Sequence, residues 1–269
     1  MNSDTVHTPF RVLLGPELVS GEGAKSESPY LLAFLPDARH GHARPAVVVL
    51  PGGGYWIVAM GHEGVEVGGW LQSYGFAVFV VHYRVRRRHP IPLSDAQRAI
   101  RLVRHHADRW RVDPERIGLL GFSAGGHLAM TAATAPAEGN ASADDPVERV
   151  SARVAFLVLG YPVISMAAPW AHAGSRVNLL GDPPDPALAT ALSGENRVSA
   201  STPPTFLFHA HDDRGVPPRH SLAFYEALLA AGVPAELHIY ESGGHGFGLG
   251  QDHPVRPALL RWLMRRTQG

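Results

Sequence analysis

Ser123 stands in the sequence Gly-Phe-Ser-Ala-Gly, a setting in which a serine hydroxyl can act as a nucleophile. The apolar run Arg116–Leu120 before it predicts a strand, and the small apolar run Gly125–Ala135 after it predicts a helix. At such a strand-to-helix turn, flanking glycines remove side chains that would clash. The helix N-terminus favours developing negative charge. The pattern therefore indicates covalent catalysis by Ser123, rather than a turn that only lets a helix pack against a strand.

A base must take the proton of the serine, because a serine hydroxyl is otherwise a poor nucleophile. His245 lies in the sequence Gly-Gly-His-Gly-Phe, just after the last predicted strand. A histidine among loop glycines does not have the setting of a core histidine. Enzymes with this kind of serine turn carry the nucleophile, the acid and the base in that order along the chain. We therefore expect His245 to be the base.

The acid is expected after the strand that precedes His245, where Asp212 and Asp213 are adjacent. We favour Asp213, which stands four residues after His209 at the strand end and four before Pro217. Its carboxylate would hold the imidazole in the required tautomer and stabilise the imidazolium. Asp212 stays open as the alternative.

Three glycines at residues 52–54 follow another predicted strand. They lack the spacing of a dinucleotide-binding fingerprint, which needs a third spaced glycine and a following helix. Beside a nucleophilic serine, a glycine turn supplies backbone N–H groups that stabilise a developing oxyanion. We expect the N–H groups of Gly53, Gly54 and Ala124 to form this oxyanion hole.

Several side chains near this turn can line a pocket. Tyr55 and Trp56 directly follow the glycines and are candidates for stacking on a sugar ring, with simple packing as the alternative. His62, Tyr161 and His172 lie in predicted loops, but no pattern places them. Substrate contacts are therefore expected first at Tyr55 and Trp56.

His209 and His211 stand just before the two aspartates, which is also a spacing of metal ligands. The pattern of metal-dependent hydrolases needs a further histidine where this chain has Arg214. The chain has no cysteine, which excludes disulfides, thiolate chemistry and cysteine-based zinc sites. We therefore expect neither a metal nor a cofactor.

The elements that must position these residues alternate along the chain. The first two apolar runs are close together and predict an antiparallel hairpin, whereas helical segments separate the later runs and predict a parallel sheet. We expect one α/β domain over residues 1–269, with about eight strands in a mostly parallel sheet and helices on both faces. The predicted strands are Arg11–Leu14, Tyr30–Leu35, Ala46–Leu50, Phe76–Tyr83, Arg116–Leu120, Val154–Leu159, Thr205–His209 and Glu236–Tyr240.

Besides the helix after Ser123, three more helices are predicted. Ser94 and Asp95 are expected to cap the first, whose apolar residues fall between Ala96 and Ala107. The others cover Pro218–Ala231 and Pro254–Arg266.

Two long loops are expected, over residues 136–148 and 162–204. The second has seven prolines and little regular pattern, and it is the best candidate for a pocket wall. It is too short for an independent domain, so no large cap is expected.

Composition limits the classes of partner. Lys plus Arg and Asp plus Glu both number 24, so the formal net charge is zero and a nucleic-acid partner is not expected. The N-terminal segment lacks the features of a signal peptide, and no apolar stretch is long enough to span a membrane. We expect a cytoplasmic protein, a monomer or small homo-oligomer, that acts on a small-molecule ester.

These residues together resemble a known family. The run PGGGYWIVAMGHEGVEVGGWLQSYGFAVFVVHYR, followed by DAQRAIRLVRHHADRWRVDPERIGLLGFSAGGHLAM, is similar to bacterial α/β-hydrolases of the acetylesterase or xylan-esterase-like (BD-FAE) type. GYPVISM, NLLGDPP, ENRVSASTPPTFLFHAHDD and ELHIYESGGHGFGL continue the match, so the likeness covers residues 45–265. Ala210 stands where the family commonly has glycine.

The resemblance implies a cap-less α/β-hydrolase fold that cleaves small acyl esters, often acetyl groups on xylo-oligosaccharides or other sugars. It implies Ser123, Asp213 and His245 as the triad and the Gly53–Gly54 turn as the oxyanion hole. We therefore expect a serine carboxylesterase that works through an acyl-enzyme. An arylformamidase, a serine aminopeptidase-like hydrolase and a non-catalytic binding protein on the same scaffold are the alternatives.

Overall fold

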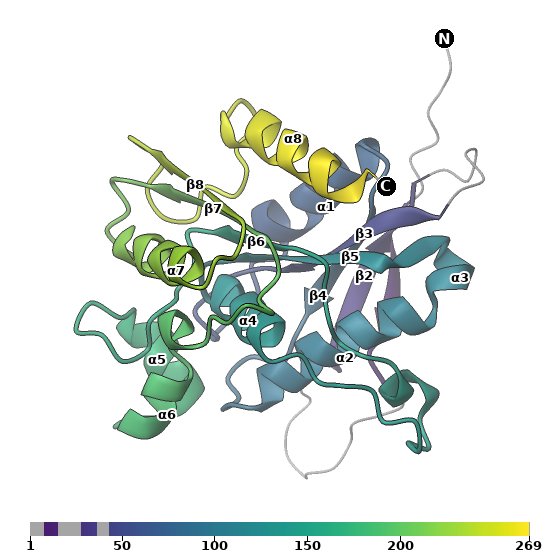
Figure 1. The fold of residues 1–269 in the computed structure, drawn as a ribbon, viewed down its shortest axis with the longest axis horizontal. Coiled ribbons are helices and arrows are strands. Elements are labelled where there is room, and N and C mark those ends of the chain that lie inside the picture. Colours follow the sequence, from purple (N-terminus) through teal and green to yellow (C-terminus); the bar gives the residue numbers. More distant parts are fainter. Residues whose placement is uncertain (1–7, 16–27, 37–42, 269) are drawn as a thin grey trace.

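A single mixed sheet forms the centre of the protein in the computed structural model, which describes residues 8–15, 28–36 and 43–268 (Figure 1). The sheet has eight strands in the order β1-β2-β4-β3-β5-β6-β7-β8. β1 pairs antiparallel with β2 and β2 with β4, and all other pairs are parallel. The eight predicted strands are confirmed as β1 (Phe10–Leu13), β2 (Tyr30–Phe34), β3 (Arg44–Leu50), β4 (Ala77–His82), β5 (Val112–Phe122), β6 (Leu157–Gly160), β7 (Thr205–Ala210) and β8 (Ala235–Tyr240).

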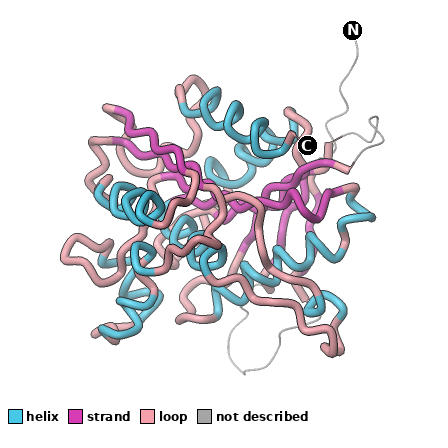
Figure 2. The backbone as a smooth tube through the Cα atoms, viewed as in Figure 1, coloured by secondary structure: helices cyan, strands magenta, loops and turns pink. Residues whose placement is uncertain are grey.

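Helices cover both faces of the sheet, as predicted (Figure 2). α1 and α8 pack on one face, and α2, α4 and α7 pack on the other. The described helices are α1 (Glu66–Ser73), α2 (Ile91–His105), α3 (Ala107–Trp110), α4 (Ser123–Thr134), α5 (Ala173–Leu180), α6 (Pro186–Ala191), α7 (Arg219–Ala230) and α8 (Val255–Thr267), with short turns η1 (Gly61–Val65), η2 (Pro146–Arg149) and η3 (Gly194–Asn196).

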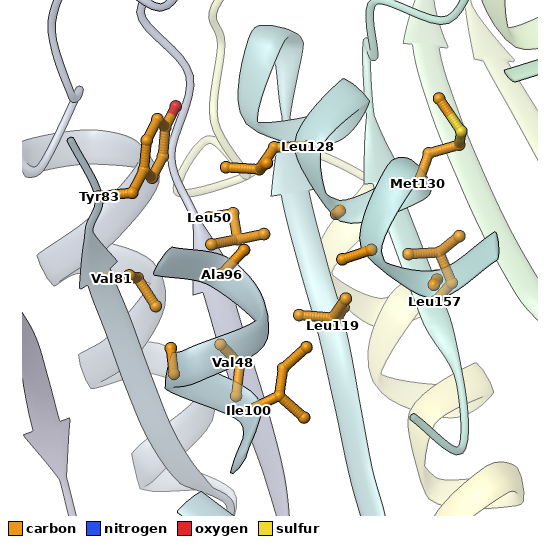
Figure 3. Packing of buried hydrophobic residues seen from close by; sticks show 14 of the residues in the cluster. Val48, Leu50, Val81, Tyr83, Ala96, Ile100, Leu119, Leu128, Met130 and Leu157 are labelled. Atoms are coloured by element: carbon orange, nitrogen blue, oxygen red, sulfur yellow. The ribbon is translucent and has the colours of Figure 1, made fainter. Parts of the chain in front are cut away.

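Central strand β3 shows why the apolar runs form a doubly covered sheet. Because side chains alternate along a strand, Val48 and Leu50 join the core beside α2 and α4, whereas Val47 and Val49 join the core on the opposite face. All four side chains are fully buried, and burying each contributes roughly 1.5–3 kcal/mol. Figure 3 shows Val48 and Leu50 among side chains from α2 and α4.

The start of α2 differs from the prediction. The proposed cap at Ser94 and Asp95 is wrong, because the helix begins at Ile91 and no side chain caps it. Asp95 is buried inside the helix and accepts hydrogen bonds from the guanidinium of Arg84 at 2.6–3.1 Å. Asp95 therefore forms an ion pair with Arg84 in the loop after β4, rather than a helix cap.

The segment of residues 162–204 is more regular than predicted, since it contains α5, α6 and η3. Pro186 at the start of α6 and the cap formed by Asp185 are the usual helix-start signals, and the abundance of proline masked them in the sequence. Short helices between β6 and β7 do not amount to a large cap, which agrees with the prediction. No helix within the described ranges combines the length and apolarity needed to cross a membrane.

His127 of α4 and His220 of α7 are buried histidines whose pKa is lowered. His127 and His220 are 1% and 0% exposed. Burial disfavours the charged imidazolium, which lowers the pKa of His127 to about 4 and that of His220 to about 3. An unfolded histidine titrates near pH 6.5, so between these values the unfolded chain binds more protons than the folded one. Stability must therefore fall as the pH drops below about 6.5.

We predict that His127 and His220 each lower the free energy of unfolding by roughly 2 kcal/mol between pH 7 and pH 5. Urea denaturation at both pH values measures this decrease. His127→Asn removes one of the two groups, and it should lose roughly 2 kcal/mol of the pH dependence even though it is less stable at pH 7. His105→Asn, at an exposed position of α2, should keep the full dependence. An unchanged dependence in His127→Asn would contradict the assignment.

Candidate active site

Ser123 lies at the junction of β5 and α4, at the edge of the sheet where the parallel strands end. Its φ angle is 51°, in the left-handed region that non-glycine residues rarely adopt. Such a conformation is strained and persists only where the surroundings enforce it. The Oγ atom lies 2.8 Å from Nε2 of His245. The predicted strand–turn–helix setting of the serine is therefore present.

Close approach of the backbone explains the glycines around this turn. A Cβ atom at Gly125 would overlap the carbonyl oxygens of Leu50 and Pro51 at the end of β3, and one at Gly121 would overlap the carbonyl oxygen of Gly125. A Cβ atom at Gly52 would lie 2.9 Å from that of Ser123. The end of β3 and the start of α4 are thus in contact only because these positions carry no side chain.

The structure brings His245 together with one of the two adjacent aspartates. Nδ1 of His245 lies 2.7 Å from Oδ2 of Asp213. Asp212 instead accepts a hydrogen bond from the backbone N–H of Gly244 at 2.8 Å. The side chain of His245 is 32% exposed, whereas that of Asp213 is fully buried. Asp213 is therefore placed to orient the imidazole, and Asp212 holds the loop beside it.

The Asp213 carboxylate has several donors besides His245. The backbone N–H groups of Gly215 and Val216 donate to Oδ1, both at 2.9 Å, and Nε2 of His209 lies 3.3 Å from Oδ2. Burial by itself raises the pKa of Asp213, but the hydrogen bonds from His209, His245 and Val216 outweigh it and hold the pKa well below its usual range. Asp213 therefore stays ionised and can stabilise an imidazolium.

The glycine turn after β3 lies against this serine. Gly53 and Gly54 have φ angles of 125° and 65°, which favour glycine. None of the described residues accepts a hydrogen bond from the N–H of Gly53 or Gly54. Ala124 is the second residue of α4, and an N–H in the first helical turn has no partner within the helix. The glycine turn and the start of α4 thus both carry backbone N–H groups without an acceptor among the described residues.

Side chains from other elements hold the turn in place. The hydroxyl of Tyr83 donates to the carbonyl of Pro51 at 2.7 Å, and the amide of Asn178 donates to the carbonyl of Gly54 at 2.9 Å. Asn178 belongs to α5, so the segment of residues 162–204 does border the site. The sequence had no local signal for either contact, because the partners are 32 and 124 residues apart.

The two aromatic candidates for sugar stacking differ in their surroundings. Tyr55 is 0% exposed, and its hydroxyl donates to Nδ1 of His127 at 2.7 Å. Its burial contradicts the expectation that its ring stacks on a sugar, because the ring packs in the core and supports the turn. Trp56 is 54% exposed, with the guanidinium of Arg86 4.2 Å from its ring centre. Trp56 alone of this pair can meet a substrate.

Glu63 was not singled out from the sequence, yet it is buried beside the site. Its carboxylate accepts the backbone N–H of Gly52 at 2.6 Å and the hydroxyl of Tyr161 at 2.7 Å. Tyr161 is fully buried, rather than lining a pocket. Burial, followed by the nearby Glu63, raises the pKa of Tyr161 well above its usual range, so its hydroxyl remains a donor. The exposed side chain of His62 lies 3.7 Å from the same carboxylate.

The other histidines considered from the sequence are accounted for by local contacts. Nδ1 of His209 lies 2.8 Å from the hydroxyl of Ser221, and His209 Nε2 lies 2.8 Å from the carbonyl of Val216. His172 is partly buried, and its Nδ1 accepts the N–H of Ser175 at the start of α5. In the part of the chain that the structure describes, no three histidine, aspartate or glutamate side chains are grouped to hold a metal ion.

Comparison with known proteins shows which family this chain belongs to. A family model described as BD-FAE matches residues 32–228. An acetylxylan esterase of Xylanibacter ruminicola is 39% identical over 238 residues, a match that covers 87% of this chain and 46% of that protein. The chain thus spans less than half the length of this curated relative.

Two solved structures extend the comparison. The crystal structure of an acetyl ester-xyloside bifunctional hydrolase from Caldicellulosiruptor lactoaceticus has a TM-score of 0.90 and 44% identity, over 98% of both chains. An α/β-hydrolase enzyme from a Medee basin deep-sea metagenome library has a TM-score of 0.73 and 25% identity, over 97% of this chain and 98% of that one. This chain therefore belongs to the BD-FAE family and has the α/β-hydrolase fold.

Proposed function

We propose that this protein is a serine carboxylesterase that hydrolyses short-chain acyl esters, with acetyl groups on xylo-oligosaccharides or other sugars as its substrates. The observation that carries the proposal is the line of contacts from Ser123 Oγ through His245 to Asp213, at 2.8 and 2.7 Å, beside three unoccupied backbone donors. A nucleophile, a base, an orienting acid and an oxyanion hole are together the requirements of acyl transfer.

The proposed mechanism has two half-reactions. Nδ1–H of His245 donates to Asp213, which leaves Nε2 as the acceptor for the hydroxyl proton of Ser123. Ser123 attacks the ester carbonyl, and the N–H groups of Gly53, Gly54 and Ala124 stabilise the oxyanion. His245 then protonates the leaving alcohol, and water activated by the same histidine releases the acid from the acyl-enzyme. No step requires a cofactor.

The substrate class rests on the relatives. The acetylxylan esterase and the acetyl ester-xyloside hydrolase both act on acetyl esters according to their names, and the second covers nearly the full length of this chain. Exposed Trp56 beside the glycine turn offers an apolar face of the kind that stacks on sugar rings. We assign the ester carbonyl to the N–H groups of the glycine turn, and the sugar to the side of Trp56.

A three-substrate panel tests the substrate class. Acetylated xylo-oligosaccharide, N-formylkynurenine and an aminoacyl-anilide represent the esterase, arylformamidase and aminopeptidase reactions. We expect kcat/KM to be highest for the acetylated xylo-oligosaccharide. A clear preference for either amide substrate would overturn the ester assignment while leaving Ser123 as nucleophile.

Ser123→Ala should lower the turnover of p-nitrophenyl acetate by roughly 10⁴-fold or more, because it removes the attacking oxygen. The measurement is initial-rate hydrolysis at saturating ester, with circular dichroism to show that the variant is folded. A fluorophosphonate should label the wild-type protein at Ser123 and leave the variant unlabelled. Wild-type turnover by a folded Ser123→Ala variant would exclude this mechanism.

The two adjacent aspartates should respond differently to the same substitution. Asp213→Asn should reduce kcat by roughly 10³- to 10⁴-fold, since the amide no longer selects the tautomer that accepts the serine proton. Asp212→Asn is the matched control and should reduce kcat less than about tenfold, because Asp212 contacts only the backbone beside His245. Kinetics on p-nitrophenyl acetate compare the two. A larger loss in Asp212→Asn would assign the acid to Asp212 instead.

The proposal also covers the location of the protein in the cell and its oligomeric state. We propose a cytoplasmic protein that is a monomer or a small homo-oligomer and needs no macromolecular partner. Cell fractionation and light scattering on the purified protein test these two points.

A further inference from the structure

Two separate loops of the site are joined through one buried carboxylate. Oε2 of Glu63 accepts the N–H of Gly52 at 2.6 Å, and Oε1 accepts the hydroxyl of Tyr161 at 2.7 Å. The oxygen of that hydroxyl accepts the N–H of Gly248 at 2.9 Å. Gly52 begins the glycine turn, and Gly248 stands three residues after His245. A continuous chain of three hydrogen bonds therefore runs from the oxyanion turn to the loop of the base.

We propose that Glu63 is a positioning residue that, with Tyr161, sets the distance between the oxyanion turn and the His245 loop. The inference rests on the proposed esterase reaction. It adds a role for two buried residues that make no direct contact with Ser123, His245 or Asp213 through hydrogen bonds.

The chemistry of the contacts requires an acceptor at residue 63. Gly52 N–H and Tyr161 O–H donate to different oxygens of Glu63, and a carboxylate accepts at both oxygens, whereas a glutamine amide would offer one acceptor oxygen and one NH2 donor. Glu63 is 3% exposed, and Tyr161 is 0% exposed. Replacing the carboxylate with an amide would therefore set an NH2 group against one of the two buried donors, and the loop that carries this donor would move to find another acceptor.

Both loops end at groups whose position matters most in the transition state. Gly52 is adjacent to Gly53, whose N–H is one of the proposed oxyanion donors, and a small displacement weakens such a donor steeply. The Tyr161 ring contacts the His245 ring edge-on, with centroids 5.2 Å apart. A shift at Glu63 would therefore act on the oxyanion hole and on the base at once, and it would reduce kcat rather than raise KM.

Backbone strain at Tyr161 agrees with a positioning role. Its φ angle is 34°, which is rare for a non-glycine residue. The backbone N–H donates to the carbonyl of Phe208 on β7 at 2.7 Å. The backbone of Tyr161 is therefore held by β7, and its hydroxyl is held by Glu63 and Gly248. Together these contacts maintain a backbone conformation that an isolated segment would avoid.

Glu63→Gln and Tyr161→Phe test the proposal, alone and combined. Each single variant should lower kcat for p-nitrophenyl acetate by about 10- to 100-fold and change KM less than about threefold. Because the two residues act through the same chain of hydrogen bonds, kcat of the double variant should be at most about threefold lower than kcat of the slower single variant. Tyr161→Phe keeps the ring, so it remains informative if Glu63→Gln does not fold.

Glu148→Gln is the matched control. Glu148 pairs with Arg98 and Arg101 on α2, away from the site. This variant should lower the melting temperature yet keep kcat within about twofold of wild type. Wild-type kcat in folded Glu63 and Tyr161 variants, or losses that simply multiply in the double variant, would overturn the positioning role.

Hydrogen exchange distinguishes a failed positioning role from a failed esterase assignment, since it needs no turnover. Amides at residues 52–57 and 244–249 should exchange faster in both Glu63→Gln and Tyr161→Phe than in wild type. Glu148→Gln should affect neither segment. Faster exchange in only one of the two segments would contradict the coupling, whatever the wild-type protein hydrolyses.

Discussion

The end of β3 and the start of α4 touch at Ser123, and no Cβ atom fits between them. Gly125 packs directly against the carbonyl of Leu50, and Gly52 packs against the serine itself. Ser123 has a left-handed conformation at this contact, and the glycine turn that begins at Gly52 lies directly against it. The doubly covered sheet makes the contact rigid, because β3 and β5 pair in register up to Leu50 and Gly121. Packing thus holds the serine and the glycine turn together, as the proposed reaction requires.

Two buried carboxylates then act in different ways around this contact. Asp213 accepts from His245 and from several backbone and side-chain donors, which keeps it ionised beside the imidazole. Glu63 accepts from the glycine turn and from Tyr161 and has no bond to the base. A buried charge is tolerated only where hydrogen bonds satisfy it, so each carboxylate draws its surrounding loops into a defined arrangement. Burial would destabilise an isolated carboxylate, but here the hydrogen bonds that compensate for it fix the loops of the site.

Much of this could be predicted from the sequence, because the informative signals are local. Continuous apolar runs predicted the eight strands, and the sequence around Ser123 predicted the turn between β5 and α4. Asp213 and Asp212 could not be separated firmly, since both lie in one short loop and only the direction of each side chain distinguishes them. Tyr55 was misjudged because its neighbours in sequence lie at the site while its ring packs under the turn.

The role of Glu63 could not be predicted from the sequence. Its partners are 11 and 98 residues away, and nothing in its neighbouring residues marks it as buried. The cap expected at Asp95 failed for a similar reason, because its partner Arg84 lies 11 residues earlier, in the loop after β4. Polar residues that bond across elements can be recognised only once the fold places their partners.

The most direct measurement on the central claim is mass spectrometry of peptides from enzyme that is quenched with acid during turnover of p-nitrophenyl acetate. Formation of an acyl-enzyme predicts one acetyl group on the peptide that contains Ser123, in an amount that decays when the ester is exhausted. Transient acetylation at a different residue, with turnover unchanged and Ser123 unmodified, would contradict the assignment of Ser123 as the nucleophile.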